Sequence, residues 1–229
     1  QVLQPMGFGA ERPQIMLAEG MVPEDKREKY LRTLCTESHR LEHLVENVLA
    51  YARLEKDARG GRLELRTVRD LLTPMTERFR ERAAQAGLEF AVELSQAQEK
   101  PRVHVDPAAA EQVLFNLVDN ACKYAATADD RRIEVHVQRL GDRLVIGVRD
   151  HGPGIPPADA RRLFRPFHKS ARAAAHSAPG VGLGLALARR LARSLGGDLR
   201  LVSGAGPGAC FELWLRSAPA DMAGSPGIV

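Results

Sequence analysis

The sequence predicts an α+β fold, in which a two-layer α/β sandwich follows one long helix. The first observation is an apolar repeat in residues 24–55, where spacings of three and four residues alternate as in bundle-forming helices. The second is a change of pattern after residue 61, where short alternating stretches typical of strands interleave with helical periods. With 229 residues, of which 44% are hydrophobic and 27% charged, the chain is long enough to bury a sizeable core.

The long helix is predicted over residues 23–58, after an irregular stretch, 1–22, that prolines and glycines interrupt. One helix cannot bury an apolar seam of this kind alone. An amphipathic helix lying on its own domain is one interpretation, but the sustained period favours a bundle between chains or within a hairpin. We therefore expect a homodimer through residues 24–55. The seam consists of Leu31, Leu34, Ser38, Leu41, Val45, Val48 and Ala52.

Residues 62–216 are expected to form one domain of helices alternating with a mostly antiparallel sheet, which makes the sandwich two layers deep. Residues 217–229 are expected to be a flexible tail. His136 shares the polar face of its strand with Glu134 and Gln138, so we expect it to be solvated. Strands are predicted at 62–67, 88–94, 102–105, twice within 131–150, at 198–203 and at 209–216, and helices at 70–86, from Asp106-Pro107 onward, at 157–163 and at 182–196.

Composition excludes several classes of protein. The 33 basic and 29 acidic residues are interleaved and aromatics make up only 5%, so nucleic-acid binding is not expected. Cys35, Cys122 and Cys210 are odd in number, far apart and in no CxxC pair, which argues against a disulfide framework or a zinc site and fits a reducing cytoplasm. No apolar run approaches the ~20 residues of a membrane span, so any membrane attachment would lie in segments that this sequence does not include.

The stretch "FNLVDNACKYA" has the period of a helix but carries an unusual polar stripe. Asn116 and Asn120 are four residues apart and therefore stack on one helix face. Lys123 and Tyr124 extend the stripe. Paired asparagines on a helix can also simply cap a neighbouring element, so this signal alone is weak.

Three further stretches follow in order along the chain. In "RDHGPGIP", Asp150 ends a strand, and Gly152 and Gly154 free the backbone for close approach to a ligand. "LFRPFHKS" precedes a polar, alanine-rich loop at 168–179, and "GVGLGLALARRLA" opens a helix whose first amides can bind phosphate. Each of these motifs alone could be a packing device or a turn, but the set in this order is specific.

"NLVDNACKY", "DHGPGIP", "LFRPFHK" and "GVGLGLALA" resemble the N, G1, F and G2 boxes of bacterial two-component sensor histidine kinases. The wider group shares its ATP-binding fold with gyrase, Hsp90 and MutL. The resemblance covers about residues 24–216, and "SHRLEHLVENVLAYARLEK" is similar to the second helix of that family's dimerisation bundle. It implies an ATP-binding catalytic domain of the histidine kinase/gyrase/Hsp90/MutL type, with ATP and Mg²⁺ as ligands and a response regulator receiver domain as partner.

The resemblance also implies roles for the helix residues. Asn116 and Asn120 would hold the Mg²⁺ that bridges the ATP phosphates, since amide oxygens are hard ligands suited to that ion. Lys123 would reach the phosphates, and Tyr124 would lie near the ribose and the phosphates. In hydrolytic members of the wider group a glutamate stands at the position of Asn116. Because asparagine cannot take a proton, we expect phosphoryl transfer with little hydrolysis.

The other motifs would surround the base and close over the phosphates. Asp150 would accept a hydrogen bond from the adenine amino group, and Ile155 would pack near the base. The segment 168–179 would be the ATP lid, with Lys169 as its phosphate contact. The remaining nucleotide contacts implied by the resemblance are Gly152, Gly154, Gly180, Val181, Gly182, Leu183 and Gly184.

The acceptor histidine is not recognisable, so no catalytic residue is assigned. In the resembled family it precedes a carboxylate on the first bundle helix, and that position falls at or just before Gln1. His39 is followed by Arg40 and belongs to the second-helix pattern. We expect the catalytic portion of a sensor histidine kinase whose acceptor helix is cut or replaced. The alternatives are an ATP-binding pseudokinase and, disfavoured by residues 24–55, a serine kinase of the anti-sigma type.

Overall fold

The computed structural model describes residues 62–94, 101–126, 128–168, 182–202 and 207–218, together with eight positions between 27 and 45. The chain divides into two units, Gln1–Leu49 and Ala50–Val229. The described residues of the first unit, among them Leu31, Leu34 and Val45, are all helical. Most of the predicted long helix, the stretch 1–22 and residues 219–229 lie outside the described residues.

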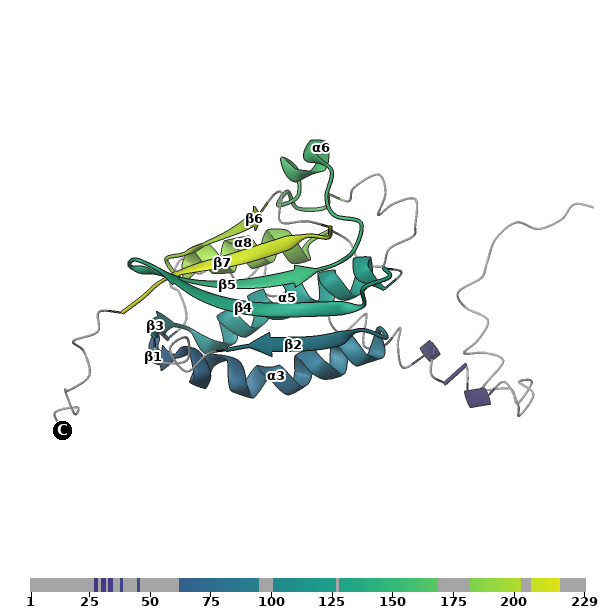
Figure 1. Cartoon of the computed structure of the whole chain (residues 1–229), viewed down its shortest axis with the longest axis horizontal. Helices are drawn as coiled ribbons and strands as arrows, with labels where there is room; N and C mark the ends of the chain where they lie inside the picture. The colour runs from purple at the N-terminus through teal and green to yellow at the C-terminus, as the bar shows by residue number, and fades with distance from the viewer. Residues whose placement is uncertain are drawn as a thin grey trace, which may run out of the picture. The chain divides into compact units, whose positions relative to one another are not determined.

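The second unit contains a five-stranded sheet in the order β2-β4-β5-β7-β6 (Figure 1). Only β2 and β4 run parallel, and the other neighbours are antiparallel, as the sequence predicted. A separate antiparallel ladder joins β1 and β3. The strands are β1 (Glu64–Thr67), β2 (Glu89–Glu93), β3 (Arg102–Val105), β4 (Arg132–Leu140), β5 (Arg143–Asp150), β6 (Asp198–Val202) and β7 (Cys210–Arg216).

Three helices, α3 (Val68–Gln85), α5 (Pro107–Ala125) and α8 (Gly184–Ser194), pack on one face of this sheet, and the strands lie in front of α5 and α8 in Figure 1. A short helix, α6 (Pro157–Ala160), lies in the connection after β5. The alternation of the strands sends Ile133, Val135 and Val137 into the core with the apolar residues of the helices. This arrangement confirms the two-layer α/β sandwich. We refer to the opposite side of the sheet, which no described helix of this unit covers, as the open face.

Side chains at the helix starts explain where α3 and α5 begin. Thr67 caps α3 by accepting a hydrogen bond from the Asp70 amide at 3.1 Å, so the helix starts two residues earlier than predicted. Asp106 caps α5 by accepting from the amides of Ala108 and Ala109, with Pro107 at the first helical position as expected. The Asp106 cap therefore defines where α5, the helix that carries the asparagine stripe, begins.

Two local predictions need correction. His136 is half-buried and not solvated, because its ring lies directly over Gly147 of the neighbouring strand. Ser217, which the sequence placed in the tail, donates its amide to the Asp142 carbonyl at 2.8 Å, and the Ala218 amide donates to Arg102. The ordered domain therefore extends at least to Ala218. Among the described residues, every helix falls short of the length and apolar character that a membrane crossing requires.

Candidate nucleotide-binding site

The asparagine stripe lies on α5 where that helix packs against α8. Asn116 is only 4% exposed, and its Nδ2 is the one buried side-chain nitrogen or oxygen in the described residues that lacks a hydrogen-bond partner. Its Oδ1 lies 3.3 Å from the position that a Cβ would take at Gly184, so the amide faces the start of α8. An unpartnered buried amide destabilises a fold by about 1–3 kcal/mol, which indicates a group reserved for a ligand.

Asp119, which the sequence analysis missed, is a buried carboxylate on the same helix. Its Oδ1 accepts from Arg82 Nη2 at 2.8 Å and from Nε at 3.0 Å, and its Oδ2 pairs with Lys123. Burial by itself would raise the pKa of Asp119, but the attraction of Lys123 and Arg82 prevails and holds it below its usual value. The spacing of Asp119 and Lys123, four residues apart on a helix, was the available signal.

Lys123 has a partner that the sequence analysis did not name. The sequence assigned it to the ATP phosphates, whereas in the structure its ammonium group is paired with Asp119 one helical turn away. Three-quarters of its side-chain surface is covered. The pair holds the cation on the face that carries Asn116 and Asn120, and contact with a phosphate would require the ammonium group to leave or share Asp119.

Asn120 and Tyr124 are half-buried, and Tyr124 lies where α5 meets the loop after β5. The carbonyl oxygen of Tyr124 lies 2.9 Å from the position that a Cβ would take at Gly152. A side chain at Gly152 would therefore push the loop off the helix. Burial, and then the negative charge of Asp119, raise the pKa of Tyr124, so its phenol stays neutral.

Asp150 ends β5 in a cradle of backbone amides. It is 5% exposed, and its Oδ1 accepts from the Gly152 amide at 2.9 Å and the Ala209 amide at 3.2 Å. Oδ2 takes no hydrogen bond from the described residues. Burial raises the pKa of Asp150, although the two amide hydrogen bonds partly oppose this. The cradle holds one carboxylate oxygen and leaves the other available to a donor outside the described residues.

Gly208 is a second residue that the sequence analysis missed. Its φ is +93°, and a Cβ there would lie 1.8 Å from the carbonyl oxygen of Asp150. It belongs to the turn "GAGPG", which was interpreted only as a connection between strands. The carbonyl of Gly208 also lies close to Gly154, and Ile155 packs at the edge of the core. The loop after β5 and the start of β7 thus form one closely packed backbone unit.

The start of α8 is the third part of the site. Leu183 stands at the N-cap position and makes no side-chain capping bond, so the first amides of the helix have no capping side chain. The side chain of Leu183 is buried, and only its backbone can face a ligand. Gly182 accepts a hydrogen bond from the Phe167 amide at 3.0 Å, which joins the third and fourth motifs. Lys169, Gly180 and Val181 lie outside the described residues.

Phe164 anchors the third motif to the sheet. Its ring meets Phe211 edge to face at 6.4 Å, and the Arg189 guanidinium lies over it at 4.6 Å. Arg189 in turn donates to Asp198 at 3.1 Å. Phe167, by contrast, is exposed and has a φ of 60°. The motif therefore has one partly buried aromatic residue that packs against the core and one at the surface.

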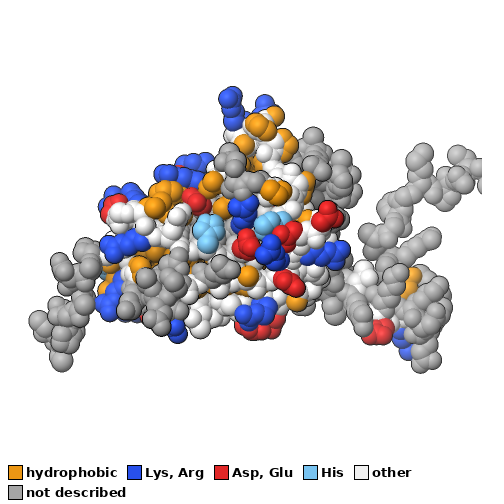
Figure 2. Space-filling model, viewed as in Figure 1, with side chains coloured by type: hydrophobic (Ala, Val, Ile, Leu, Met, Phe, Trp, Pro, Cys, Tyr) orange, Lys and Arg blue, Asp and Glu red, His pale blue; other side chains and the backbone are white. Residues whose placement is uncertain are grey.

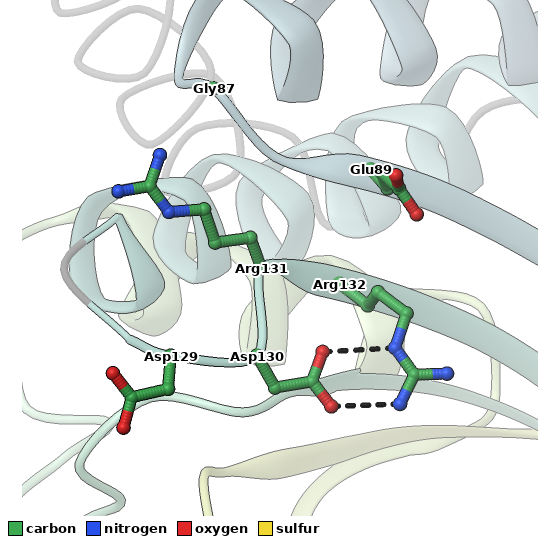
Figure 3. A pocket seen from close by; sticks show the side chains of 6 residues that line it. All are labelled: Gly87, Glu89, Asp129, Asp130, Arg131 and Arg132. Atoms are coloured by element: carbon green, nitrogen blue, oxygen red, sulfur yellow. Dashed lines mark hydrogen bonds and ion pairs between the residues drawn. The ribbon is translucent and has the colours of Figure 1, made fainter.

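A surface pocket lies beside the starts of β2 and β4, and Figure 3 shows that charged side chains surround it. Arg132 donates two hydrogen bonds to Asp130 there, from Nε to Oδ1 at 2.9 Å and from Nη2 to Oδ2 at 2.7 Å. None of the residues that line this pocket carries a predicted nucleotide contact. The nucleotide site that the motifs indicate is therefore a different surface. The lining residues are Gly87, Glu89, Asp129, Asp130, Arg131 and Arg132.

The family model described as histidine kinase-, DNA gyrase B-, and HSP90-like ATPase matches residues 105–219, which is half of the chain. The chain belongs to this family. The match begins just before α5 and ends after β7, so it includes all three parts of the site.

Curated relatives are sensor proteins. The Sensor protein KdpD of Escherichia coli K12 is 33% identical over 178 residues, which cover 77% of this chain and 19% of the relative. The Alginate biosynthesis sensor protein KinB of Pseudomonas aeruginosa is 31% identical over 194 residues, 84% of this chain and 31% of the relative. The aligned part of the chain thus spans 19% and 31% of the length of these two relatives.

Among solved structures, full-length ShkA in complex with AMPPNP matches with a TM-score of 0.67 and 28% identity, covering 87% of this chain and 40% of ShkA. The resemblance to the ATP-binding domain of sensor histidine kinases is thereby confirmed. The structure brings Asn116 and Gly184 together at the α5–α8 contact, and it pairs Asp119 with both Lys123 and Arg82 of α3. It places Asp150 and Gly152 beside the end of α5.

Proposed function

We propose that this chain is the catalytic portion of a sensor histidine kinase, which holds Mg-ATP between α5, the loop after β5 and the start of α8. It passes the γ-phosphate to a histidine, from which the phosphate goes to the receiver domain of a response regulator. The observation that carries this proposal is the buried, unpartnered amide of Asn116, which faces the uncapped start of α8. Membership of the ATPase family supports it.

The adenine end of the site rests on Asp150. The Gly152 and Ala209 amides hold Oδ1, so Oδ2 accepts a hydrogen bond from the adenine amino group. A carboxylate repels the carbonyl oxygen that guanine carries at the same position. The close packing of Gly208 against the Asp150 backbone keeps this carboxylate in place.

The phosphate end rests on α5 and α8. The first amides of α8 attract the negative phosphates, because they have no capping side chain and the helix dipole favours an anion there. Asn116 and Asn120 fit a magnesium ion because both offer amide oxygens. The buried, unpartnered Nδ2 of Asn116 is a hydrogen-bond donor and suits a phosphate oxygen. When bound, Mg²⁺ supplies neutralising charge to the phosphates. The ion pair with Asp119 keeps the Lys123 ammonium group on the helix face that would meet the phosphates.

The residues favour transfer over hydrolysis. Asn116 cannot accept a proton, and Asp119 is a poor base because two cations hold its pKa low. Neither side chain activates a water molecule. The site therefore positions the γ-phosphate for another nucleophile.

The acceptor is a histidine that precedes a carboxylate on a bundle helix. None of the seven histidines of this sequence is followed by Asp or Glu. The exposed seam residues Leu31 and Val45 support a homodimer through residues 24–55 that completes such a bundle. A cytoplasmic location follows from this role, with any membrane anchor carried by other segments.

The test is Mg-ATP binding by calorimetry. Asn116→Ala and Asn120→Ala are each expected to weaken binding at least 100-fold, about 2.8 kcal/mol. Gln138→Ala removes a half-buried amide from β4 and is the matched control, with wild-type affinity expected. Wild-type affinity in the Asn116→Ala variant would contradict the site.

Transfer is tested by incubation with γ-labelled ATP, with and without a polypeptide that carries a helix with a histidine followed by a carboxylate. Acid-labile label is expected on that polypeptide alone. ATP binding without label on any acceptor would replace the kinase by a nucleotide-binding pseudokinase.

A further inference from the structure

Three side chains with metal-binding chemistry meet on the open face of the sheet. His136 comes from β4, and Cys210 and Glu212 come from β7. Their nitrogen, sulfur and oxygen atoms all lie within 4.8 Å of one another. Figure 2, drawn from this side of the sheet, shows histidine side chains among acidic and basic ones over the strands. The nucleotide site uses none of the three residues.

Gly147 makes this meeting possible. It lies on β5, between β4 and β7, and pairs with His136 on one side and Glu212 on the other. A Cβ at Gly147 would lie 2.1 Å from His136 Cε1. Because the glycine has no side chain, the imidazole crosses β5 and reaches the residues of β7.

Neighbouring side chains hold Glu212 in place. Trp214 Nε1 donates to Glu212 Oε2 at 2.9 Å, and the Arg200 guanidinium lies over the Trp214 ring at 4.3 Å. Glu212 is 9% exposed and Cys210 is 5% exposed. Such a hydrogen bond behind a carboxylate orients it in the way that outer partners orient metal ligands. The hydrogen bond from Trp214 engages Oε2 of Glu212 and accounts for one of its two carboxylate oxygens.

We propose that His136, Cys210 and Glu212 form a binding site for a divalent transition-metal ion, with Zn²⁺ as the ion that the ligands suit best. Imidazole, thiolate and carboxylate are the ligands that zinc binds in proteins, and three of them leave a fourth position for water. A neutral imidazole with two anionic ligands balances the two charges of the ion. Mg²⁺ prefers oxygen ligands and does not suit this set.

Binding requires small adjustments. Zinc–ligand bonds of about 2.0–2.3 Å put tetrahedral ligand atoms roughly 3.5 Å apart, so the three atoms must approach by about 1 Å, which rotation of the half-buried His136 ring allows. Burial, and then the charge of Glu212, raise the pKa of the Cys210 thiol to about 11, so the ion displaces a proton on binding. Arg149 pairs with Cys210 in the ladder and is a neighbouring cation that the two anionic ligands outweigh.

The experiment measures Co²⁺ and Zn²⁺ binding to the purified, tag-free chain without nucleotide. Wild type is expected to bind one Co²⁺ with a thiolate-to-cobalt charge-transfer band, which Zn²⁺ removes by displacement and Mg²⁺ leaves unchanged. Cys210→Ser is expected to abolish the band. His136→Ala and Gly147→Ala, which leave the thiol in place, are expected to weaken Co²⁺ binding at least tenfold.

Matched controls come from the same chain. Cys122→Ser changes another buried thiol, on α5, and His104→Ala removes an exposed imidazole on β3. Both are expected to bind Co²⁺ as wild type does, and so is Asn116→Ala, which makes the result independent of the nucleotide site. A wild-type chain without the band, or a band that survives in Cys210→Ser, would overturn the proposal. Should Cys210→Ser fail to fold, unchanged affinity in His136→Ala would overturn it equally.

Discussion

The two faces of the sheet both hold buried polar groups, but they hold them differently. On the helix-covered face, Asn116 and Asp150 each keep an atom without a partner from the described residues, and tightly packed backbone surrounds Asp150. On the open face, the His136 ring lies over Gly147, and the Trp214 side chain positions Glu212. Backbone therefore shapes the proposed nucleotide site, whereas rotatable side chains shape the proposed metal site.

The two faces are one residue apart at the start of β7. The Ala209 amide donates to Asp150, and the next residue, Cys210, belongs to the open face. The same alternation separates Asp150 from Arg149 on β5. A strand thus serves two sites at once, and a substitution can be aimed at one face with little change to the other.

The largest expected effect separates the faces by adding one methyl group to each. Gly208→Ala places a Cβ against the Asp150 carbonyl, at a residue whose φ is +93°. Because the packed backbone of Asp150 cannot move aside as a side chain can, we expect a loss of at least about 3 kcal/mol in the free energy of unfolding. Gly147→Ala meets only the His136 ring, which can turn away, and should cost about 1 kcal/mol. Urea unfolding measures both. Equal losses would show that the two faces do not differ in this way.

A second prediction concerns Asp119, the buried group on the helix-covered face that is already paired. Asp119→Asn should cost about 3 kcal/mol of stability, the lower end for a buried ion pair, because Arg82 and Lys123 keep about a quarter of their side chains exposed. Thermal or urea unfolding near neutral pH gives the value. Glu77→Gln, which breaks the exposed pair with Arg80, is the control and should change stability by less than 1 kcal/mol.

The pH dependence gives that prediction a sign. The pKa of Asp119 is lowered in the folded state, so its stabilisation is present above the unfolded pKa of about 3.9 and is lost as pH falls through the lower, folded value. The difference in stability between wild type and Asp119→Asn should therefore shrink only below about pH 4. A difference that stays constant through this range would mean that Asp119 is not held as an anion.

The smallest expected effect tests the partner-free oxygen of Asp150. In Asp150→Asn the two backbone hydrogen bonds can persist, but a donor replaces the oxygen proposed for adenine. ATP affinity should fall at least tenfold, consistent with about 1.5–3 kcal/mol for a charged hydrogen bond, and the preference for ATP over GTP should narrow. Asp142→Asn, at an exposed turn, is the matched control. Equal competition by GTP in the wild type would contradict this role.

Much of the fold could be predicted because its signals are local. The cap at Asp106-Pro107, the β4–β5 hairpin and the final two strands follow from residues within a few positions of one another. The four motifs identified the candidate site for the same reason. The ion pair between Arg82 and Asp119 could not be read in this way, since 37 positions separate the two residues.

By itself, the sequence determined the class of the fold, the helix that carries Asn116 and Asn120, and the family to which the chain belongs. Only the tertiary structure decided that Arg82 pairs with Asp119, that Gly208 packs against the Asp150 backbone, and that His136 crosses Gly147 toward Cys210. The physical reason is range: helix periods, caps and turns act between near neighbours, whereas these contacts depend on strand order and register, which distant segments set together. The spacing of the cysteines in the sequence argued against a zinc site. It could not reveal that His136 on β4 meets Cys210 and Glu212 on β7 across the intervening strand β5.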